Sequence, residues 1–136
     1  MSKPIMPEDM AKENSEHSQQ VALFMWASMM LREGMYPELR WMFAVPNGGD
    51  RSISVAASLV AEGVKSGVSD VVLPCARGGM HGLFIEMKRP KPPGKTSPQQ
   101  DEFMAAMTLE GYECAVCWTW LEAVEVICEY LAKERT

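Results

Sequence analysis

Apolar and polar positions follow a helical period in four segments of the chain. In the first segment, apolar residues return every three or four positions after Ser15 until Gly34 and Pro37 end the pattern. The last two segments open with a serine or threonine followed three residues later by Gln or Glu, which is a capping box. The predicted helices run from Ser15 to the stop at Gly34, from about Ser52 to Glu62, from the cap at Ser97 to about Glu110, and onward from the cap at Thr119.

Four shorter runs are rich in β-branched, aromatic and other apolar residues and are bounded by turn residues, which predicts strands. A glycine-rich connection over 77–82 is short enough to pair the second strand with the third as neighbours. The predicted strands cover 40–45, 71–73, 83–88 and 112–117.

The resulting order, α-β-α-β-β-α-β-α, is typical of an α/β sandwich with a central mixed β-sheet and flanking helices on both sides. Residues 1–13 hold two prolines and clustered charges without periodicity, so we predict a flexible N-terminal arm there. With 136 residues, of which 47% are hydrophobic, the chain has enough apolar material for a core. We therefore expect residues 14–136 to form a single domain.

Composition also narrows the expected location and partners. No run approaches the roughly 20 consecutive apolar residues of a membrane helix, and the N-terminus is polar where a signal peptide would be apolar. The four cysteines, in a chain without an export signal, are expected to be reduced thiols. We expect a cytoplasmic protein with no membrane partner and no small-molecule cofactor.

Charge is segregated along the chain. The formal net charge is −5, yet the segment from Arg40 to Lys95 carries eight basic residues against four acidic ones. A basic footprint is the usual mark of a nucleic-acid binder, whereas many charge runs are only solvated surface. The charge pattern alone leaves both interpretations open.

Three residues of the predicted strands could carry chemistry. Side chains alternate along a strand, so Glu86 and Lys88 project from the same face of 83–88, and Asp70 begins the neighbouring strand. Two carboxylates brought close together repel unless a cation lies between them, and a hard divalent ion such as Mg²⁺ prefers oxygen ligands. A third acidic residue, Glu16, is predicted at the core-facing end of the first helix, where an unpaired carboxylate would be costly.

A structural ion pair between Lys88 and either Asp70 or Glu86 explains the same residues without a metal. Three residues at loose spacing are a weak motif, so at this point both explanations stand.

A longer ordered pattern resembles the VRR-NUC family of the PD-(D/E)XK nucleases. The resemblance covers about residues 14–117 and implies a restriction-endonuclease-like fold. Stand-alone members of the family are small phage and bacterial enzymes that act on branched DNA such as four-way (Holliday) junctions. The pattern consists of Glu16, Pro46-Asn-Gly-Gly49, Gly63-Val-Lys-Ser-Gly67-Val-Ser-Asp70, Phe84-Ile-Glu86-Met-Lys88 and Ser97-Pro-Gln-Gln100.

The resemblance assigns a role to each matching residue. It implies that Asp70 and Glu86 bind the metal and that Lys88 is the catalytic lysine, which could orient or deprotonate the attacking water or stabilise developing charge. The Met87 carbonyl is expected as a third protein ligand, and Glu16 as a ligand of a second metal or of a metal-bound water. Serine at position 69 departs from the proline that the family usually places before the aspartate.

Gln100 matches the family's glutamine after the Ser-Pro turn, and it has two possible roles. It could close the capping box of its helix, or it could contact Lys88 or the attacking water.

Other residues are expected to contact DNA phosphates, which position a duplex without reading its sequence. For each of them alone, a solvated surface residue is the simpler interpretation. They are Asn47, Arg51, Lys65, Arg89, Lys91 and Lys95.

Together these observations predict a Mg²⁺-dependent DNA endonuclease, with Mn²⁺ as a possible substitute, that is selective for branched DNA. One site per small domain would favour a two-fold homodimer for cutting both strands of a junction. Two alternatives remain open: a non-catalytic DNA-binding or assembly module on the same fold, and a nuclease acting on RNA or single strands.

Overall fold

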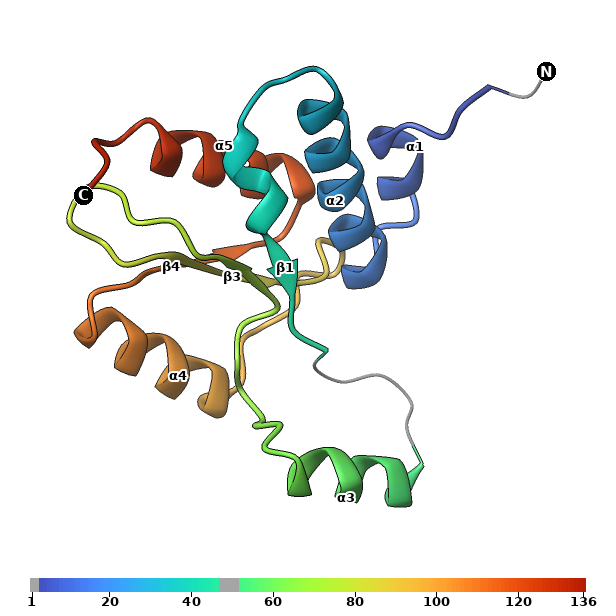
Figure 1. Cartoon of the computed structure of the whole chain (residues 1–136). Coiled ribbons are helices and arrows are strands. Elements are labelled where there is room, and N and C mark those ends of the chain that lie inside the picture. Colours follow the sequence, from blue (N-terminus) through green and yellow to red (C-terminus); the bar gives the residue numbers. More distant parts are fainter. Residues whose placement is uncertain (1–2, 47–51) are drawn as a thin grey trace.

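The computed structural model describes residues 3–46 and 52–136, and its centre is a four-stranded sheet in the order β1-β2-β3-β4 (Figure 1). The first two pairs of neighbours are antiparallel, whereas β3 and β4 are parallel. The sheet is therefore mixed, as predicted. The strands are β1 (Phe43–Ala44), β2 (Val71–Leu73), β3 (Leu83–Met87) and β4 (Glu113–Cys117).

Helices cover both faces of this sheet. Figure 1 shows α2 (Glu16–Arg32) and α5 (Trp120–Leu131) on one face and α4 (Pro98–Leu109), which connects β3 to β4, on the other. This arrangement confirms the α/β sandwich with flanking helices.

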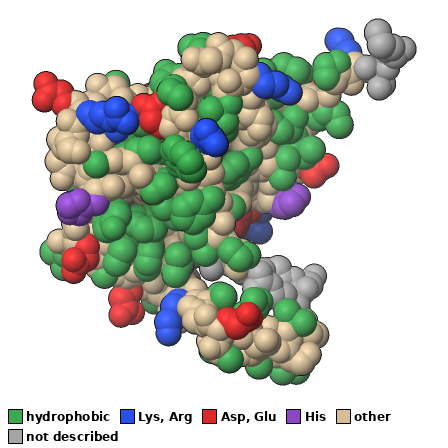
Figure 2. All heavy atoms as spheres, viewed as in Figure 1, with side chains coloured by type: hydrophobic (Ala, Val, Ile, Leu, Met, Phe, Trp, Pro, Cys, Tyr) green, Lys and Arg blue, Asp and Glu red, His purple; other side chains and the backbone are tan. Residues whose placement is uncertain are grey.

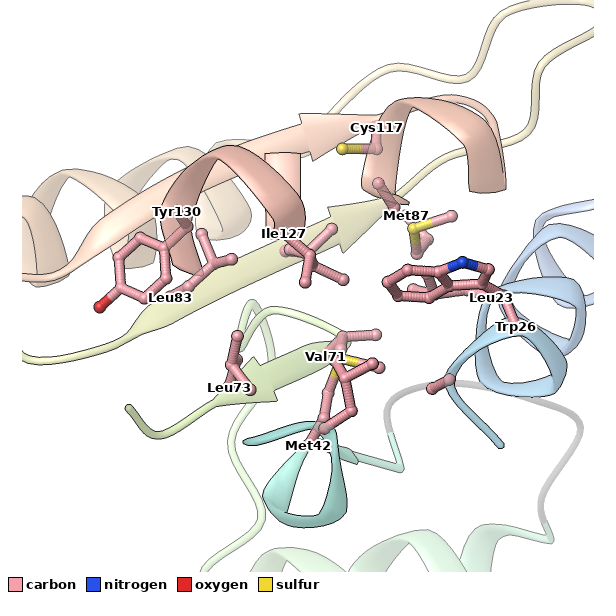
Figure 3. Packing of buried hydrophobic residues seen from close by; sticks show 14 residues of the cluster. Leu23, Trp26, Met42, Val71, Leu73, Leu83, Met87, Cys117, Ile127 and Tyr130 are labelled. Atoms are coloured by element: carbon pink, nitrogen blue, oxygen red, sulfur yellow. The ribbon is translucent and has the colours of Figure 1, made fainter. Parts of the chain in front are cut away.

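The main core lies between the sheet and the α2/α5 layer (Figure 3). Alternation along β3 turns Leu83, Ile85 and Met87 into this core, and all three are fully buried. Leu23 of α2 and Ile127 of α5 close it from above. The intervening residues of β3, including Glu86, consequently face the α4 side.

A smaller aromatic cluster holds α4 against the opposite face. The Phe84 ring meets Phe103 of α4 and Tyr112 edge-on, with centroids 5.2 Å apart in each pair. Because Glu86 follows two positions after Phe84, it points toward the same helix, nearer to its N-terminal end.

The N-terminal region contains a helix that the sequence did not predict. The segment predicted as a flexible arm over 1–13 includes the helix α1 (Pro7–Ala11). Gln19 of α2 explains why the helix is held, since its side-chain NH₂ donates to the Ala11 carbonyl (3.0 Å) and its side-chain oxygen accepts from the Trp120 N–H (2.8 Å). One buried amide thus joins the end of α1 to α2 and to the start of α5.

The predicted strand over 40–45 is also corrected. The structure has a 3₁₀ helix, η1 (Pro37–Trp41), followed by only the two residues of β1. Tyr36 adopts a left-handed backbone conformation (φ 50°) and Pro37 supplies the first helical φ, so the chain turns before it can extend. Leu39 and Met42 are buried by this turn. Apart from α1 and η1, the observed order of elements matches the prediction.

Helix α3 (Ile53–Ala61) stands apart from the rest of the described chain (Figures 1 and 2). None of its residues is buried, and no other described element packs against it extensively. Across residues 3–46 and 52–136, no helix is both long and apolar enough to cross a membrane.

Candidate active site

Four polar side chains meet where β2 begins and β3 ends. Asp70 directly precedes β2, Glu86 lies in β3, Lys88 follows it, and Gln100 lies in the first turn of α4. The first three are almost inaccessible to solvent, with exposed fractions of 7%, 1% and 9%. Buried ionisable groups are costly unless they have partners or a function, so each contact of this cluster is informative.

Glu86 is held through one of its two oxygens. Its Oε1 accepts a hydrogen bond from the Gln100 side-chain amide at 2.5 Å and lies 3.3 Å from the Lys88 ammonium nitrogen. Its Oε2 is buried and has no hydrogen-bond partner among the residues that the structure describes. A buried carboxylate oxygen without a partner is unfavourable by itself and is a free ligand position for a cation.

Asp70 is fixed by the backbone of β3. Its Oδ2 accepts a hydrogen bond from the Met87 N–H at 2.8 Å, which brings the carboxylate across from β2 to the residue beside Glu86. The predicted approach of Asp70 to Glu86 therefore occurs, and a backbone amide rather than a side chain sets it.

The charged forms of Asp70 and Glu86 are both disfavoured in this buried environment. Burial, followed by the negative charge of Asp70, raises the pKa of Glu86 to about 7, although Lys88 opposes this shift. Burial also raises the pKa of Asp70, opposed by the hydrogen bond from the Met87 N–H and by the positive charge of Lys88. A bound cation would relieve this mutual repulsion.

The predicted ion pair between Glu86 and Lys88 is present, but it does not account for the whole cluster. It engages only Oε1 of Glu86 and leaves Oε2 without a partner. Asp70 and Glu86, whose two carboxylates offer hard oxygen ligands around an unsatisfied atom, fit a divalent ion such as Mg²⁺.

Gln100 closes the capping box, which is one of the two roles considered for it, but its other contact is not the one predicted. Its side-chain oxygen accepts the Ser97 N–H at 2.8 Å, and the Ser97 hydroxyl accepts the Gln100 N–H at 3.2 Å, which completes the capping box. Because an amide has a donor end as well as an acceptor end, its NH₂ remains free to bind Glu86. The contact is with Glu86 rather than with Lys88, so Gln100 is a positioning residue for the carboxylate.

The prediction that Glu16 faces the core is wrong, because the first residue of α2 is exposed. Ser18 and Gln19 are buried instead. Glu16 still lies near the site: loss of hydration and then the charge of Asp70 raise its pKa. Among the residues that the structure describes, no three His, Cys, Asp or Glu side chains form a metal-binding group, so Glu16 does not join Asp70 and Glu86 in one ligand cluster.

Four of the basic residues expected to contact phosphates are exposed at the surface. Arg89, Lys91 and Lys95 are exposed on the loop that joins β3 to α4, and Lys65 is exposed between α3 and β2. Asn47 and Arg51 lie outside the described residues.

The loop between β3 and α4 is held by contacts that the sequence did not reveal. The Trp118 indole N–H donates to the Gly94 carbonyl (2.8 Å), and the Arg89 side chain donates to the Pro92 carbonyl (2.9 Å). Trp118 and Gly94 are 24 residues apart, and no local signal in the sequence reveals such a partner.

Comparison with known proteins supports this interpretation. The family model of the VRR-NUC domain matches residues 14–119. A solved structure described as a VRR_NUC domain protein is similar over 89% of this chain and 91% of its own, with 26% sequence identity and a TM-score of 0.73. No match was found among curated proteins. Since the matched region includes every element of the buried cluster, the chain belongs to the VRR-NUC domain family and carries a nuclease-type, DNA-processing domain.

Proposed function

We propose that this protein is a Mg²⁺-dependent endonuclease that hydrolyses phosphodiester bonds in branched DNA such as four-way junctions. The observation that carries the proposal is the buried Glu86 carboxylate, with one oxygen held by Gln100 and Lys88 and the other without a partner beside Asp70.

Asp70 and Glu86 would hold the metal, with the Met87 carbonyl as a further ligand. The bound ion would supply positive charge for a phosphate oxygen and lower the pKa of a bound water. Mn²⁺ has similar oxygen preferences and could replace it.

The protein's own groups prepare this site. The Gln100 amide fixes the orientation of the Glu86 side chain, and the Met87 N–H fixes that of Asp70. Lys88 remains positioned beside Glu86, where its ammonium group could stabilise negative charge on a phosphate or orient a water molecule. The exposed basic residues on the β3–α4 loop would contact flanking phosphates.

Helix α3 supports the proposal of a homodimer. It carries no charged residue from Ile53 to Ala61, and the exposed fractions of Ile53 and Val60 are 91% and 67%. A helix that is apolar all round is normally buried, and nothing in the described chain buries this one. Contact with a second copy would cover it and provide two active sites for the two strands of a junction.

The test of activity is incubation of the protein with labelled linear, flapped and four-way DNA, with Mg²⁺ or with a chelator. We expect cleavage of the branched substrates in Mg²⁺ and none after chelation. Cleavage that survives chelation would contradict the metal-dependent mechanism. Metal-independent binding without cleavage would favour the non-catalytic module, and faster cutting of RNA or single strands would replace the proposed substrate.

The test of assembly is sedimentation of a double variant, Ile53→Lys with Val60→Lys. We expect the wild type to sediment as a dimer and the variant as a folded monomer. Leu109→Lys is the matched control, because Leu109 is 89% exposed at the end of another helix. A monomeric wild type, or a control that dissociates equally, would contradict the role of α3.

A further inference from the structure

Beside the buried cluster lies a cleft of about 990 Å³, and most of the residues that line it have no role in the proposed chemistry. It is formed by the outward face of α2 and by the segment from Ala44 to Pro46, and Asp70 lies on its lining. We call this the α2 cleft. Its volume is at the upper end of the range for small-ligand sites, so it could accommodate a group the size of a nucleotide.

The walls of the α2 cleft are mainly apolar. Val21, Phe24 and Met25 lie three and four positions apart on one face of α2, and Ala44 and Val45 also line the cleft. Phe24 is half-buried, with part of its surface packed on the core, so the ring is held firmly while it also lines the cleft.

Away from the proposed metal site, the charges of the described residues that line the α2 cleft favour a neutral occupant over a phosphate. Among the described residues that line it, none is Lys or Arg, whereas Glu16 and Asp70 are both acidic. The polar rim also includes Gln20 and His17, which can exchange hydrogen bonds with a neutral group. A suitable occupant is therefore flat and uncharged, with apolar faces and a polar edge.

We propose that the α2 cleft binds an unpaired nucleobase next to the phosphate that is cleaved. This inference rests on the proposed nuclease function, because Asp70 joins the cleft to the proposed metal site and a nucleotide places its base close to its own phosphate. Ring faces are covered by neighbours within a stacked duplex, so only an unstacked base can lie against Phe24. The substrate then has at least one unpaired or readily unstacked nucleotide at the cut, as a flap or an open branch point does.

The first experiment is a double-mutant cycle in which one change is made in the protein and the other in the DNA. Cleavage of flapped DNA in Mg²⁺ is measured with wild type and Phe24→Leu, using a normal or an abasic nucleotide at the unpaired position beside the cut. Base stacking on an aromatic ring corresponds to roughly tenfold in affinity. We expect either change alone to raise KM by about that factor, and the two together to cause no further rise. Independent, multiplicative effects would overturn the proposal.

Two further variants separate binding from folding. Leu31→Ala removes an exposed apolar side chain of the same helix outside the α2 cleft, and we expect it to leave KM unchanged. Val21→Trp fills the cleft without removing the core contact of Phe24, and we expect it to abolish the preference for a normal over an abasic nucleotide. If the folded Val21→Trp protein keeps the full preference, the base does not occupy the cleft.

The last measurement distinguishes failure of this inference from failure of the nuclease proposal. The fluorescence of 2-aminopurine at the unpaired position is recorded with the metal-free wild-type protein, so no cleavage is required. Binding that changes the fluorescence with wild type, but not with Val21→Trp, supports the cleft even if no DNA is cut. Efficient cleavage with no Phe24-dependent or Val21-dependent fluorescence change refutes the cleft and leaves the nuclease function in place.

Discussion

Glu86 and Glu16, the two glutamates that the family pattern assigns to the site, occupy opposite environments. Glu86 is 1% exposed in the central sheet and is held by Gln100 and Lys88. Glu16 is exposed at the first turn of α2, across the α2 cleft from the sheet. Burial raises the free-energy cost of a charge on Glu86, whereas water solvates and screens the charge of Glu16.

The difference shows two ways in which a carboxylate can contribute to an active site. Glu86 is oriented before any ligand arrives, and its unsatisfied oxygen gives a cation a favourable place to bind. Glu16 is exposed at the start of α2 and interacts with Asp70 through its charge. We therefore expect changes at Glu86 to affect both chemistry and stability, and changes at Glu16 to have smaller effects.

The largest expected effect is that of Glu86→Gln on cleavage. Loss of a metal-binding charge removes several kcal/mol of transition-state stabilisation, or roughly a thousandfold in rate. Single-turnover cleavage of branched DNA in saturating Mg²⁺ measures it. Glu102→Gln on the exposed surface of α4 is the control and should retain the wild-type rate. A Glu86→Gln enzyme with unimpaired cleavage would exclude this residue from the chemistry.

The second prediction concerns the pH dependence of stability in the metal-free protein. The pKa of Glu86 is raised from 4.5 to about 7, so the folded protein holds this proton more tightly than the unfolded chain does. The contribution of the protonated group is complete below pH 4.5 and is lost as the pH rises through 7. We expect the free energy of unfolding to fall by about 3 kcal/mol across this interval.

Denaturant unfolding between pH 4 and 8, with and without Mg²⁺, measures this fall. Glu86→Gln has no carboxyl to titrate, so its fall should be much smaller and its metal-free stability at pH 8 higher than that of the wild type. Mg²⁺ should raise wild-type stability at pH 8 but not that of the variant. The same pH profile for both proteins would mean that other groups dominate.

The third prediction is a smaller loss for Glu16→Gln. An exposed carboxylate that acts on the site at longer range corresponds to about tenfold in rate or in metal affinity. Cleavage at varied Mg²⁺ concentration, compared with Glu86→Gln, tests the contrast directly. If the two variants lose equal activity, Glu16 is a direct ligand despite its exposure.

The smallest expected effect is that of Ser69→Ala on stability. Ser69 is fully buried, and its hydroxyl oxygen is, with Glu86 Oε2, one of two described buried side-chain atoms without a hydrogen-bond partner. Unlike Glu86, it has no charge with which to attract a cation. Removing an unsatisfied hydroxyl should raise the free energy of unfolding by about 1 kcal/mol. Destabilisation in a thermal or denaturant unfolding experiment would show that this hydroxyl has a partner in solution.

Short-range patterns predicted much of the fold and of the site. The Ser97–Gln100 capping box depends on residues three positions apart, and the shared direction of Glu86 and Lys88 depends on strand alternation. The pairing of β2 with β3 also followed from a short connection. Such features are determined by local backbone geometry, so the sequence is enough to find them.

The errors occurred where distant residues decide the outcome. Helix α1 is held by Gln19, which α2 turns inward, where its side chain binds the backbone of Ala11 and of Trp120. An apolar stripe therefore gave the wrong orientation for Glu16. The partnership of Gln100 with Glu86 likewise depends on how α4 packs beneath β3 through Phe84 and Phe103.

By itself, the sequence determined the types and order of most elements, the caps, and the set of acidic, basic and amide groups available for chemistry. These follow from propensities and from spacings of two to four residues. Only the tertiary structure decided which carboxylate is buried, which amide holds it and which oxygen remains unsatisfied. Burial and contact between distant segments arise only when the sheet and helices pack together. Packing removes water from these charged groups, and this desolvation makes their interactions strong.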